Sequence, residues 1–574
     1  MKTIYLIICV LAVPFFLNAQ NMEESGKKAK RYVSSEYDRN ALTFIGLDFD
    51  ENLSSEVLTR FSEAQKVPEK YYDNTISHNL IKTEAKRDSA FGVMLKLKEN
   101  DIAKWLNENK VGQQILSIWF NRQPDGSFNV DILKERGLFN ANDHDFIVAS
   151  SSKRGESSLM DMGMQLVNQS YVLAFDFYDI MTMEQYYNKN ETATEKRTSN
   201  GYRASLNSYL LKLDFNDSVA AVFFRDYWVG ENDPNKADRI AAFNNANFPF
   251  VAVSNQHNSV SATQYNPEQP LAPEVQKTKS ELLDQMGTSA IEMVLTDIER
   301  QRQDFRVKAM VSDVKPISAK IGKKEDLKFD QRYFVHENRV KRNGDITSRR
   351  VAVVKSMKVV DNRKVTTGQT EPSTFYQIAG GKVDNYGMFL EQRNDVGLNL
   401  FLGTTVGGLS GYTGRVEYYM SKVFGGLVGK DKSGKALTSW KIYVEGAYRG
   451  DSYEFDEFVD DFTFTRFSFG VAKDFYPISF LHWGPFIGYG VESGDWEDNM
   501  DEEKIATDFV EMGARLGVNL AHNIQLLGSV NYYMMLSSEI QDKDGEVLNE
   551  DFDYKGFFED RMGLGISIGL RIMF

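Results

Sequence analysis

The stretch Met562-Gly-Leu-Gly-Ile-Ser-Ile-Gly-Leu-Arg-Ile-Met-Phe574 decides the fold of the last third of this chain. Large apolar side chains stand at every second position of it. The face they form consists of Met562, Leu564, Ile566, Ile568, Leu570, Ile572 and Phe574, and the other face of Gly563, Gly565, Ser567, Gly569 and Arg571. Because successive side chains of a strand point to opposite sides, one face suits lipid and the other a crowded polar interior. The stretch therefore predicts a membrane-spanning strand.

The same alternation recurs seven times upstream. The segments that carry it are 398–403, 415–420, 441–445, 466–471, 482–492, 510–519 and 525–532. A soluble β-sandwich also alternates, but the later connections are short and long in turn, as periplasmic turns and surface loops are. The first two connections break this rule. Eight strands predict an antiparallel transmembrane β-barrel over residues 395–574.

An eight-stranded barrel has an interior just wide enough for side chains to fill. The charged residues predicted to point inward are Arg415, Lys441, Arg449, Arg466, Arg515, Arg571, Glu417, Glu445, Asp474, Glu492 and Glu511. Opposite charges in near balance should pair, because an unpaired buried charge is costly. A filled lumen is expected rather than a wide diffusion pore.

This set of features resembles the small outer-membrane barrels of the OmpA and OmpX type. A last strand that ends on Phe574 also resembles the recognition end of outer-membrane barrel proteins. The resemblance implies location in an outer membrane, with lipid and the barrel-insertion machinery as partners. No stretch of 18 apolar residues follows the start of the chain, which argues against a helical membrane protein.

The beginning of the chain reads as an export signal. Met1-Lys2 is positive, Ile4–Leu17 is apolar but short for a bilayer span, and Ala19 offers a small residue for cleavage. We expect a signal peptide at 1–19 and a flexible leader at 20–40. Cys9 is the only cysteine, so the mature chain should contain no disulfide, thiolate nucleophile or cysteine-bound metal.

Residues 41–303 predict a periplasmic α+β domain. The expected elements are helices at 102–109 and 159–167, strands at 115–120 and 171–177, paired strands at 209–215 and 219–227, a linker at 255–272 and an amphipathic helix at 273–303. The last of these rests on the helical spacing of Leu282, Met286, Ile291, Val294 and Ile298.

Residues 304–394 predict a small β-module of short strands. Its segments Ile321–Leu327 and Tyr386-Gly387-Met388 are similar to those of β-modules in periplasmic proteins of the curli-secretion and flagellar-assembly type. That resemblance implies a strand, a turn and a short β-barrel that follow a helix.

Neither the composition nor the motifs indicate a nucleic-acid, catalytic, cofactor or metal site. A net charge of −14 argues against nucleic acid as a partner. The six histidines lack metal-ligand spacing. The segment Gly429–Ala436 nearly matches a phosphate-binding loop but lacks the final hydroxyl, and Asp542–Asp551 lacks the first ligand of a calcium loop. We therefore predict no catalytic residue, cofactor or metal.

The sequence favours a non-enzymatic outer-membrane protein whose barrel anchors a periplasmic binding or scaffolding domain for an unidentified protein or envelope partner. One alternative is a component of an export or assembly machinery. The other is a lipid-modifying barrel enzyme that uses Ser468, His482 and Glu492. In either case the N-terminal domain should lie in the periplasm, and the acidic segments around Asp456, Asp498 and Asp544 outside, because longer loops belong to the extracellular side.

Overall fold

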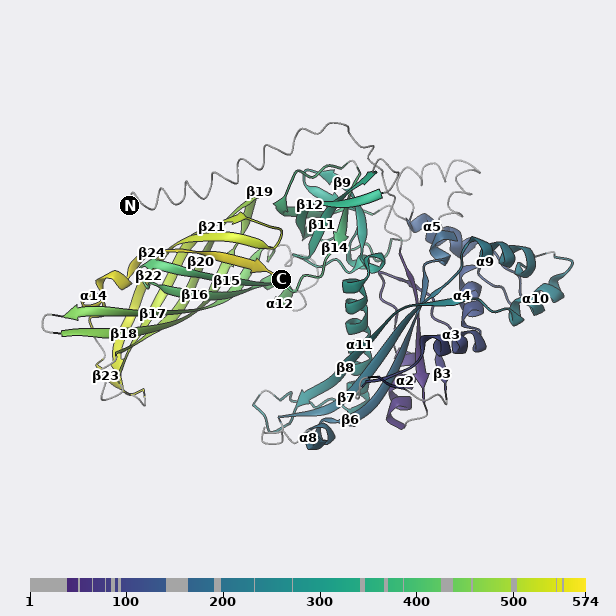
Figure 1. The fold of residues 1–574 in the computed structure, drawn as a ribbon, viewed down its shortest axis with the longest axis horizontal. Helices are drawn as coiled ribbons and strands as arrows, with labels where there is room; N and C mark the ends of the chain where they lie inside the picture. The colour runs from purple at the N-terminus through teal and green to yellow at the C-terminus, as the bar shows by residue number, and fades with distance from the viewer. Residues whose placement is uncertain are drawn as a thin grey trace.

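The computed structural model describes residues 39–574 apart from 50–51, 65, 78, 84–87, 91–93, 141–163, 190–197, 232, 271, 341–345, 366–369, 386, 425–436, 456–457, 497–502, 543–544 and 550–551. Three parts follow one another along the chain (Figure 1): a sheet covered by helices, a small barrel and a larger barrel. Predicted segments that fall on the other residues, such as the phosphate-loop likeness at 429–436, lie outside the described part.

The first part is built on a six-stranded sheet with the order β2-β1-β6-β7-β8, and β3 also pairs with β1. Its strands are β1 (Ala41–Asp48), β2 (Tyr72–Asp73), β3 (Leu80–Lys82), β6 (Ser170–Thr182), β7 (Ser199–Leu213) and β8 (Phe250–Tyr265). Strand β1 runs parallel to its three partners, whereas β6, β7 and β8 are antiparallel. A separate hairpin joins β4 (Asp88–Ala90) to β5 (Met94–Lys96).

Helices cover both faces of this sheet. They are α2 (Asn52–Ala64), α3 (Glu99–Glu108), α4 (Val111–Trp119), α5 (Asp131–Asn140), α8 (Met183–Lys189), α9 (Asp217–Val222), α10 (Lys236–Asn245) and α11 (Lys279–Gln301). Strand β1 is buried on both sides because Leu42 and Phe44 pack with α2 and α11, while Ile45 and Leu47 pack with α3 and α4. The predicted mixture of helices and strands is confirmed.

Three local predictions for this part are wrong. Residues 115–119 belong to helix α4 and Phe120 is its C-cap, because the apolar spacing continues from Val111 at helical intervals that a six-residue window does not reveal. Residues 219–227 are helical because Asn216 caps α9 by accepting hydrogen bonds from two backbone N–H groups. Residues 255–272 are largely strand β8, a polar strand at the sheet edge that pairs with β7 along its length.

The long helix after the sheet is confirmed as α11. It begins at Lys279, six residues later than predicted, because Thr278 and Glu281 form a capping box there. All five side chains that predicted it are buried.

The β-module is a closed barrel with the strand order β10-β13-β12-β11-β14-β9. Its strands are β9 (Lys308–Val314), β10 (Ile317–Ala319), β11 (Arg332–Val340), β12 (Ile346–Lys358), β13 (Ser373–Gly380) and β14 (Met388–Gln392). They enclose their own apolar core, which includes Val335, Val354, Phe375 and Leu390. The structure agrees with the predicted short β-barrel that follows a helix.

The C-terminal part is a second closed barrel of eight antiparallel strands. They are β15 (Leu398–Gly407), β16 (Gly411–Tyr419), β17 (Trp440–Phe455), β18 (Phe458–Lys473), β20 (Leu481–Trp496), β21 (Lys504–Asn519), β22 (Ile524–Gln541) and β24 (Gly563–Met573). Each pairs with its neighbours in sequence, and β24 closes the barrel on β15. Short strands β19 (Phe475–Ile478) and β23 (Val547–Asn549) extend its two ends. All eight predicted strands are confirmed.

The acidic connections are shorter than predicted, because the strands that flank them are longer. Strands β17 and β18 remain paired as far as Phe455 and Phe458, so Asp451 and Asp461 lie within the sheet. A 16-residue strand spans about 50 Å, whereas the apolar band of such barrels is about 25 Å tall. The extra length forms an extension of the sheet at the end opposite helix α12 (Met420–Phe424) (Figure 1).

Candidate functional site: the filled barrel and its junction with the β-module

Five charged side chains fill the lumen at the end nearest the β-module. Carboxylates Glu417 and Asp474 each contact all three of Lys441, Arg515 and Arg571. The shortest pairs are Arg515 Nη1 to Glu417 Oε1 at 2.5 Å and Lys441 Nζ to Asp474 Oδ2 at 2.6 Å. The side chains are fully buried, so this end is closed by a network of ion pairs.

A second layer lies further along the lumen. Glu445 contacts Arg415 at 2.6 Å and Arg466 at 2.9 Å. Beside them, Glu511 Oε1 accepts hydrogen bonds from the hydroxyls of Tyr443, at 2.8 Å, and Ser468, at 2.9 Å. These strands therefore meet across the lumen through polar contacts rather than around a channel.

The end of the barrel opposite α12 is closed by the segment before β24. Arg561 binds Glu492 at 2.7 Å, and its guanidinium lies 3.7 Å from the centre of the Phe464 ring. Tyr554 and Phe558, from the same segment, pack with Phe464 in a buried cluster. Sequence reasoning missed this closure because the segment carries no strand alternation.

The predicted pairing of the inward charges is thus confirmed, with two exceptions among the described residues. Glu511 forms no ion pair there and accepts hydrogen bonds from the neutral hydroxyls of Tyr443 and Ser468. Arg449 is half-exposed and binds Asp451 on its own strand at 2.7 Å. On the outside of the barrel, large apolar side chains are exposed along every strand, among them Leu402, Val416, Val444, Phe467, Ile487, Leu516, Val530 and Ile568. An outer surface of apolar side chains and an interior of charged side chains are typical of an outer-membrane barrel.

The three residues of the enzyme alternative do not come together. Ser468 donates to Glu511, Glu492 binds Arg561, and His482 Nε2 lies 2.8 Å from Arg571. His482 and Glu492 are ten residues apart on strand β20, which corresponds to about 33 Å along a strand. The geometry offers no Ser-His-acid arrangement from this set.

A buried carboxylate joins the β-module to the barrel. Asp330 accepts hydrogen bonds from Ser421 Oγ at 2.5 Å, from the backbone N–H of Ser439 at 3.1 Å and from the Tyr376 hydroxyl at 2.6 Å. Ser421 lies in α12 and Ser439 directly precedes β17, so both belong to the barrel, whereas Tyr376 lies in β13. Burial raises the pKa of Asp330 above its ordinary value.

A second carboxylate at this junction is surrounded by cations. Asp395 Oδ2 lies 2.6 Å from Lys355 Nζ of β12 and 3.7 Å from Lys422 Nζ of α12, and Arg332 approaches at 3.8 Å. Burial alone would raise the pKa of Asp395, but Lys355, Lys422 and Arg332 hold it below its ordinary value. Burial lowers the pKa of Lys422 to about 8.

Aromatic contacts complete the junction. The rings of Tyr376 and Tyr476 lie 5.5 Å apart, and Lys355 Nζ lies 3.9 Å from the centre of the Tyr419 ring. The Asn519 side chain donates a hydrogen bond to the carbonyl oxygen of Ile378. Because these contacts connect β12 and β13 of the module with three turns of the barrel, we treat the two barrels as one packed unit at this interface.

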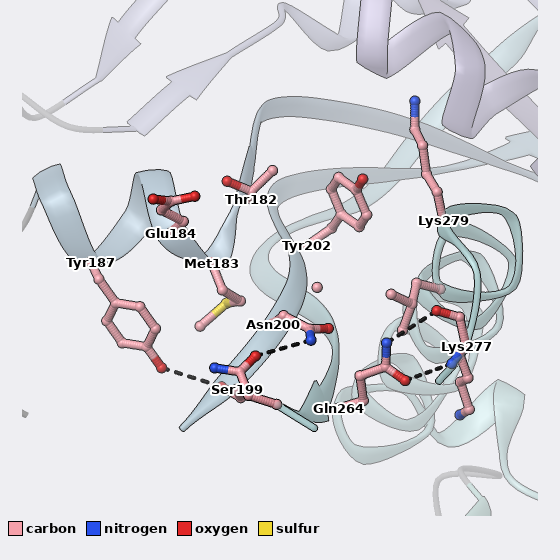
Figure 2. Close-up of a pocket in the computed structure, with 13 residues that line it drawn as sticks. Thr182, Met183, Glu184, Tyr187, Ser199, Asn200, Tyr202, Gln264, Lys277 and Lys279 are labelled. Atoms are coloured by element: carbon pink, nitrogen blue, oxygen red, sulfur yellow. Dashed lines mark hydrogen bonds between the residues drawn. The ribbon is translucent and has the colours of Figure 1, made fainter. Parts of the chain in front are cut away.

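Among the cavities in the described part of the chain, two that lie outside the large barrel are large enough to consider. One has a volume of about 1080 Å³ and is bordered by α11, by the module turn around Lys324 and by α12. The other has a volume of about 410 Å³ and lies between α8, β7 and the start of α11 (Figure 2). Its polar groups already bind one another: Tyr187 contacts Ser199 at 3.3 Å, and the Gln264 amide pairs with the backbone of Lys277.

Other classes of site are not seen in the described part of the chain. Over the ranges described above, no three His, Cys, Asp or Glu side chains gather where they could hold a metal ion. No helix among these residues is long and apolar enough to cross a membrane. At the start of the partial calcium motif, the backbone N–H of Glu546 donates to the Asp542 carboxylate at 2.8 Å.

Comparison with known proteins gives matches of structure alone. No protein-family model and no curated protein matches the chain. A major outer membrane protein from Thermus thermophilus is 17% identical, with 31% of this chain and 98% of that chain covered and a TM-score of 0.21. The N-terminal β-barrel domain of OprF from Pseudomonas aeruginosa is 11% identical, with 31% and 96% covered and a TM-score of 0.17.

The attachment invasion locus protein Ail of Yersinia pestis is 12% identical to the chain, with 30% of this chain and 96% of that chain covered and a TM-score of 0.18. With scores this low, the fold assignment rests on the chain's own strand pairing and on the distribution of its apolar and charged side chains. These features identify a small antiparallel barrel of the outer-membrane type.

Proposed function

We propose that this chain is a non-enzymatic outer-membrane protein whose barrel anchors a binding or scaffolding region in the periplasm. The outward apolar side chains and the closed eight-stranded sheet support insertion into a membrane. The even number of strands places both barrel ends on one side, where the folded N-terminal region is too large to thread a filled lumen.

The buried contacts of Asp330 and Asp395 at the module–barrel junction carry this proposal. A flexible tether would allow the periplasmic region to move freely, whereas buried ion pairs and hydrogen bonds fix the module against the barrel. The arrangement suits a protein that holds its N-terminal region at a defined place below the membrane. The filled lumen supports an anchoring role over transport through the barrel itself.

A second candidate function is membership of an export or assembly machinery. The observation that favours it is the cavity of about 1080 Å³, which the three parts of the chain form together and which could receive a segment of another subunit. In that case the substrate would pass beside this barrel or through a partner, because its own lumen is occupied by charged side chains.

Membrane fractionation tests the proposed function. The full-length protein should sediment with outer membranes and migrate faster on gels when it is not boiled, as intact barrels do. Cross-linking in cells from the cavity-lining residue Glu292 separates the two candidates: a stoichiometric partner would favour the assembly role. Recovery of the full-length chain as a soluble periplasmic monomer would contradict both.

A further inference from the structure

Two arginines of the β-module lie over one phenylalanine ring beside a turn of the barrel. The guanidinium carbons of Arg350 and Arg393 are 4.7 and 4.8 Å from the centre of the Phe334 ring. His522, from the turn between β21 and β22, meets the same ring edge-on at 5.6 Å. This arginine pair therefore stands where the module reaches the α12 end of the barrel.

Both arginines lack a counter-ion within the described part of the chain, in contrast to their neighbours. Arg332 contacts Asp395, and Arg306 binds Glu391 at 2.9 Å. Arg350 is exposed, and Nε of Arg393 is buried without a hydrogen-bond partner. Burial is the main reason why the pKa of Arg393 is lowered; the nearby Arg306, Arg350 and Arg332 lower it further, while Glu391, the partner of Arg306, raises it.

The arginine pair also lies where the apolar outer surface of the barrel ends. Leu520, two residues before His522, exposes 44% of its surface, and Phe480 exposes 55%. The two turns that carry them are joined by a hydrogen bond from the Asn519 N–H to the Phe480 carbonyl oxygen at 3.0 Å. At the boundary between the apolar band of a barrel and water lie the phospholipid headgroups.

We propose that Arg350 and Arg393 bind the phosphate of an anionic phospholipid headgroup in the periplasmic leaflet. A guanidinium presents a planar fork of N–H donors that matches phosphate oxygens, and it keeps these donors at its edge while its face lies on an aromatic ring. The acyl chains would lie along the barrel surface next to Leu520. The bound lipid would supply the missing counter-ion. This inference rests on the proposed membrane location.

Native mass spectrometry of the full-length protein in detergent tests the inference, with phosphatidylglycerol and phosphatidylcholine of equal chain length as probes. The wild type should retain phosphatidylglycerol in preference to phosphatidylcholine. Each arginine near an anionic surface contributes about a fivefold change in affinity, so Arg350→Gln should weaken retention about fivefold and R350Q/R393Q about thirtyfold.

Arg349→Gln is the matched control, because Arg349 is an exposed neighbour on the same strand whose side chain points to the other face. Its retention of phosphatidylglycerol should equal that of the wild type. Three results would overturn the proposal: an equal loss of phosphatidylglycerol retention in Arg349→Gln, unchanged retention in R350Q/R393Q, or displacement of the lipid by millimolar inorganic phosphate. The heat-dependent gel shift is measured in parallel, so a barrel that never inserts is distinguished from an inserted barrel without lipid preference.

Discussion

Ser421 Oγ donates a hydrogen bond to Asp330 Oδ2 at 2.5 Å, and with this contact the barrel binds a carboxylate of the β-module. The two residues are 91 positions apart in the chain. Because Asp330 also accepts from Tyr376 of the module and from the backbone of Ser439, one side chain connects both barrels. Asp330 is itself fully buried, so water cannot replace a hydrogen-bond partner that it loses.

Asp330→Asn should loosen this junction. The amide presents N–H groups where the carboxylate accepted hydrogen bonds, and an unsatisfied buried donor costs about 1–3 kcal/mol. Hydrogen exchange of β11 and β13 should therefore become faster, while the barrel strands remain protected. Asp326→Asn, at an exposed aspartate four residues earlier in the chain, is the control. Unchanged exchange in Asp330→Asn would show that the carboxylate does not hold the module in place.

Asp395 should make the stability of the junction depend on pH. Its pKa in the folded protein lies below the ordinary 3.8, because Lys355, Lys422 and Arg332 offset the effect of burial. At pH values between the lowered pKa and 3.8, the folded state binds fewer protons than the unfolded state. The free energy of unfolding therefore rises with pH across this range. The contribution is complete above 3.8 and is lost as the pH falls through the lowered pKa.

The measurement is the difference in unfolding free energy between the wild type and Asp395→Asn at several pH values. This difference should shrink as the pH falls below 3.8. A difference that grows on acidification would have the wrong sign for a carboxylate held by cations.

Ile568→Arg should destabilise the barrel in the membrane by about 2–4 kcal/mol, because Ile568 lies at the middle of β24 and faces outward with half of its surface exposed. Unfolding in lipid vesicles measures this cost. Val275→Arg, at an exposed position of the N-terminal region, should be tolerated. Equal tolerance at both positions would reject the register, in which Ser567 faces the lumen.

Glu417→Gln should be more harmful than its conservative chemistry suggests. The substitution leaves Lys441, Arg515 and Arg571 with Asp474 as their remaining carboxylate partner among these residues, and breaking a buried ion pair costs about 3–5 kcal/mol. In lipid vesicles, the variant should therefore unfold at a lower urea concentration than the wild type. Glu559→Gln, an exposed glutamate before β24, provides the comparison. A Glu417→Gln barrel as stable as the control would mean that the network contributes little.

Epitope tags on whole cells test the orientation. A tag beside Gly545, in the exposed turn after β22, should bind antibody on intact cells, while a tag beside Gln123 should bind only after permeabilisation. Both insertions lie in turns, so folding should survive. Labelling of the Gln123 tag on intact cells would place the N-terminal region outside and would overturn the anchoring proposal.

The barrel was predictable from sequence because each strand faces two opposite environments. Ile568 and Ser567 are adjacent in the chain, yet one is half-exposed and the other buried, and this contrast repeats along every strand. The same reasoning predicted most of the lumen pairs, since an unpaired charge in a small interior is costly, but it did not predict that Glu511 binds two neutral hydroxyls instead.

Prediction failed where a short stretch of sequence does not reveal the structural environment of its residues. Strand β8 is polar because it is the edge of its sheet, and α4 resembles a strand when read from Ile115 alone. The contacts of Asp330 with Ser421, and of Arg561 with Glu492, join residues 91 and 69 positions apart. No local pattern marks such pairs, because they arise only when distant segments meet.

The closure of the large barrel by β15 and β24 also imposes an order in time. Strand β15 obtains one of its two neighbours only when β24 has been added, and until then an edge of unpaired backbone groups stays open. The module contacts both sides of this seam, through Asp395 just before β15 and through the hydrogen bond from Arg332 to the Met573 carbonyl oxygen at 3.4 Å. Complete docking of the module therefore requires a finished barrel, so the module takes its final position only after β24 has closed the barrel on β15.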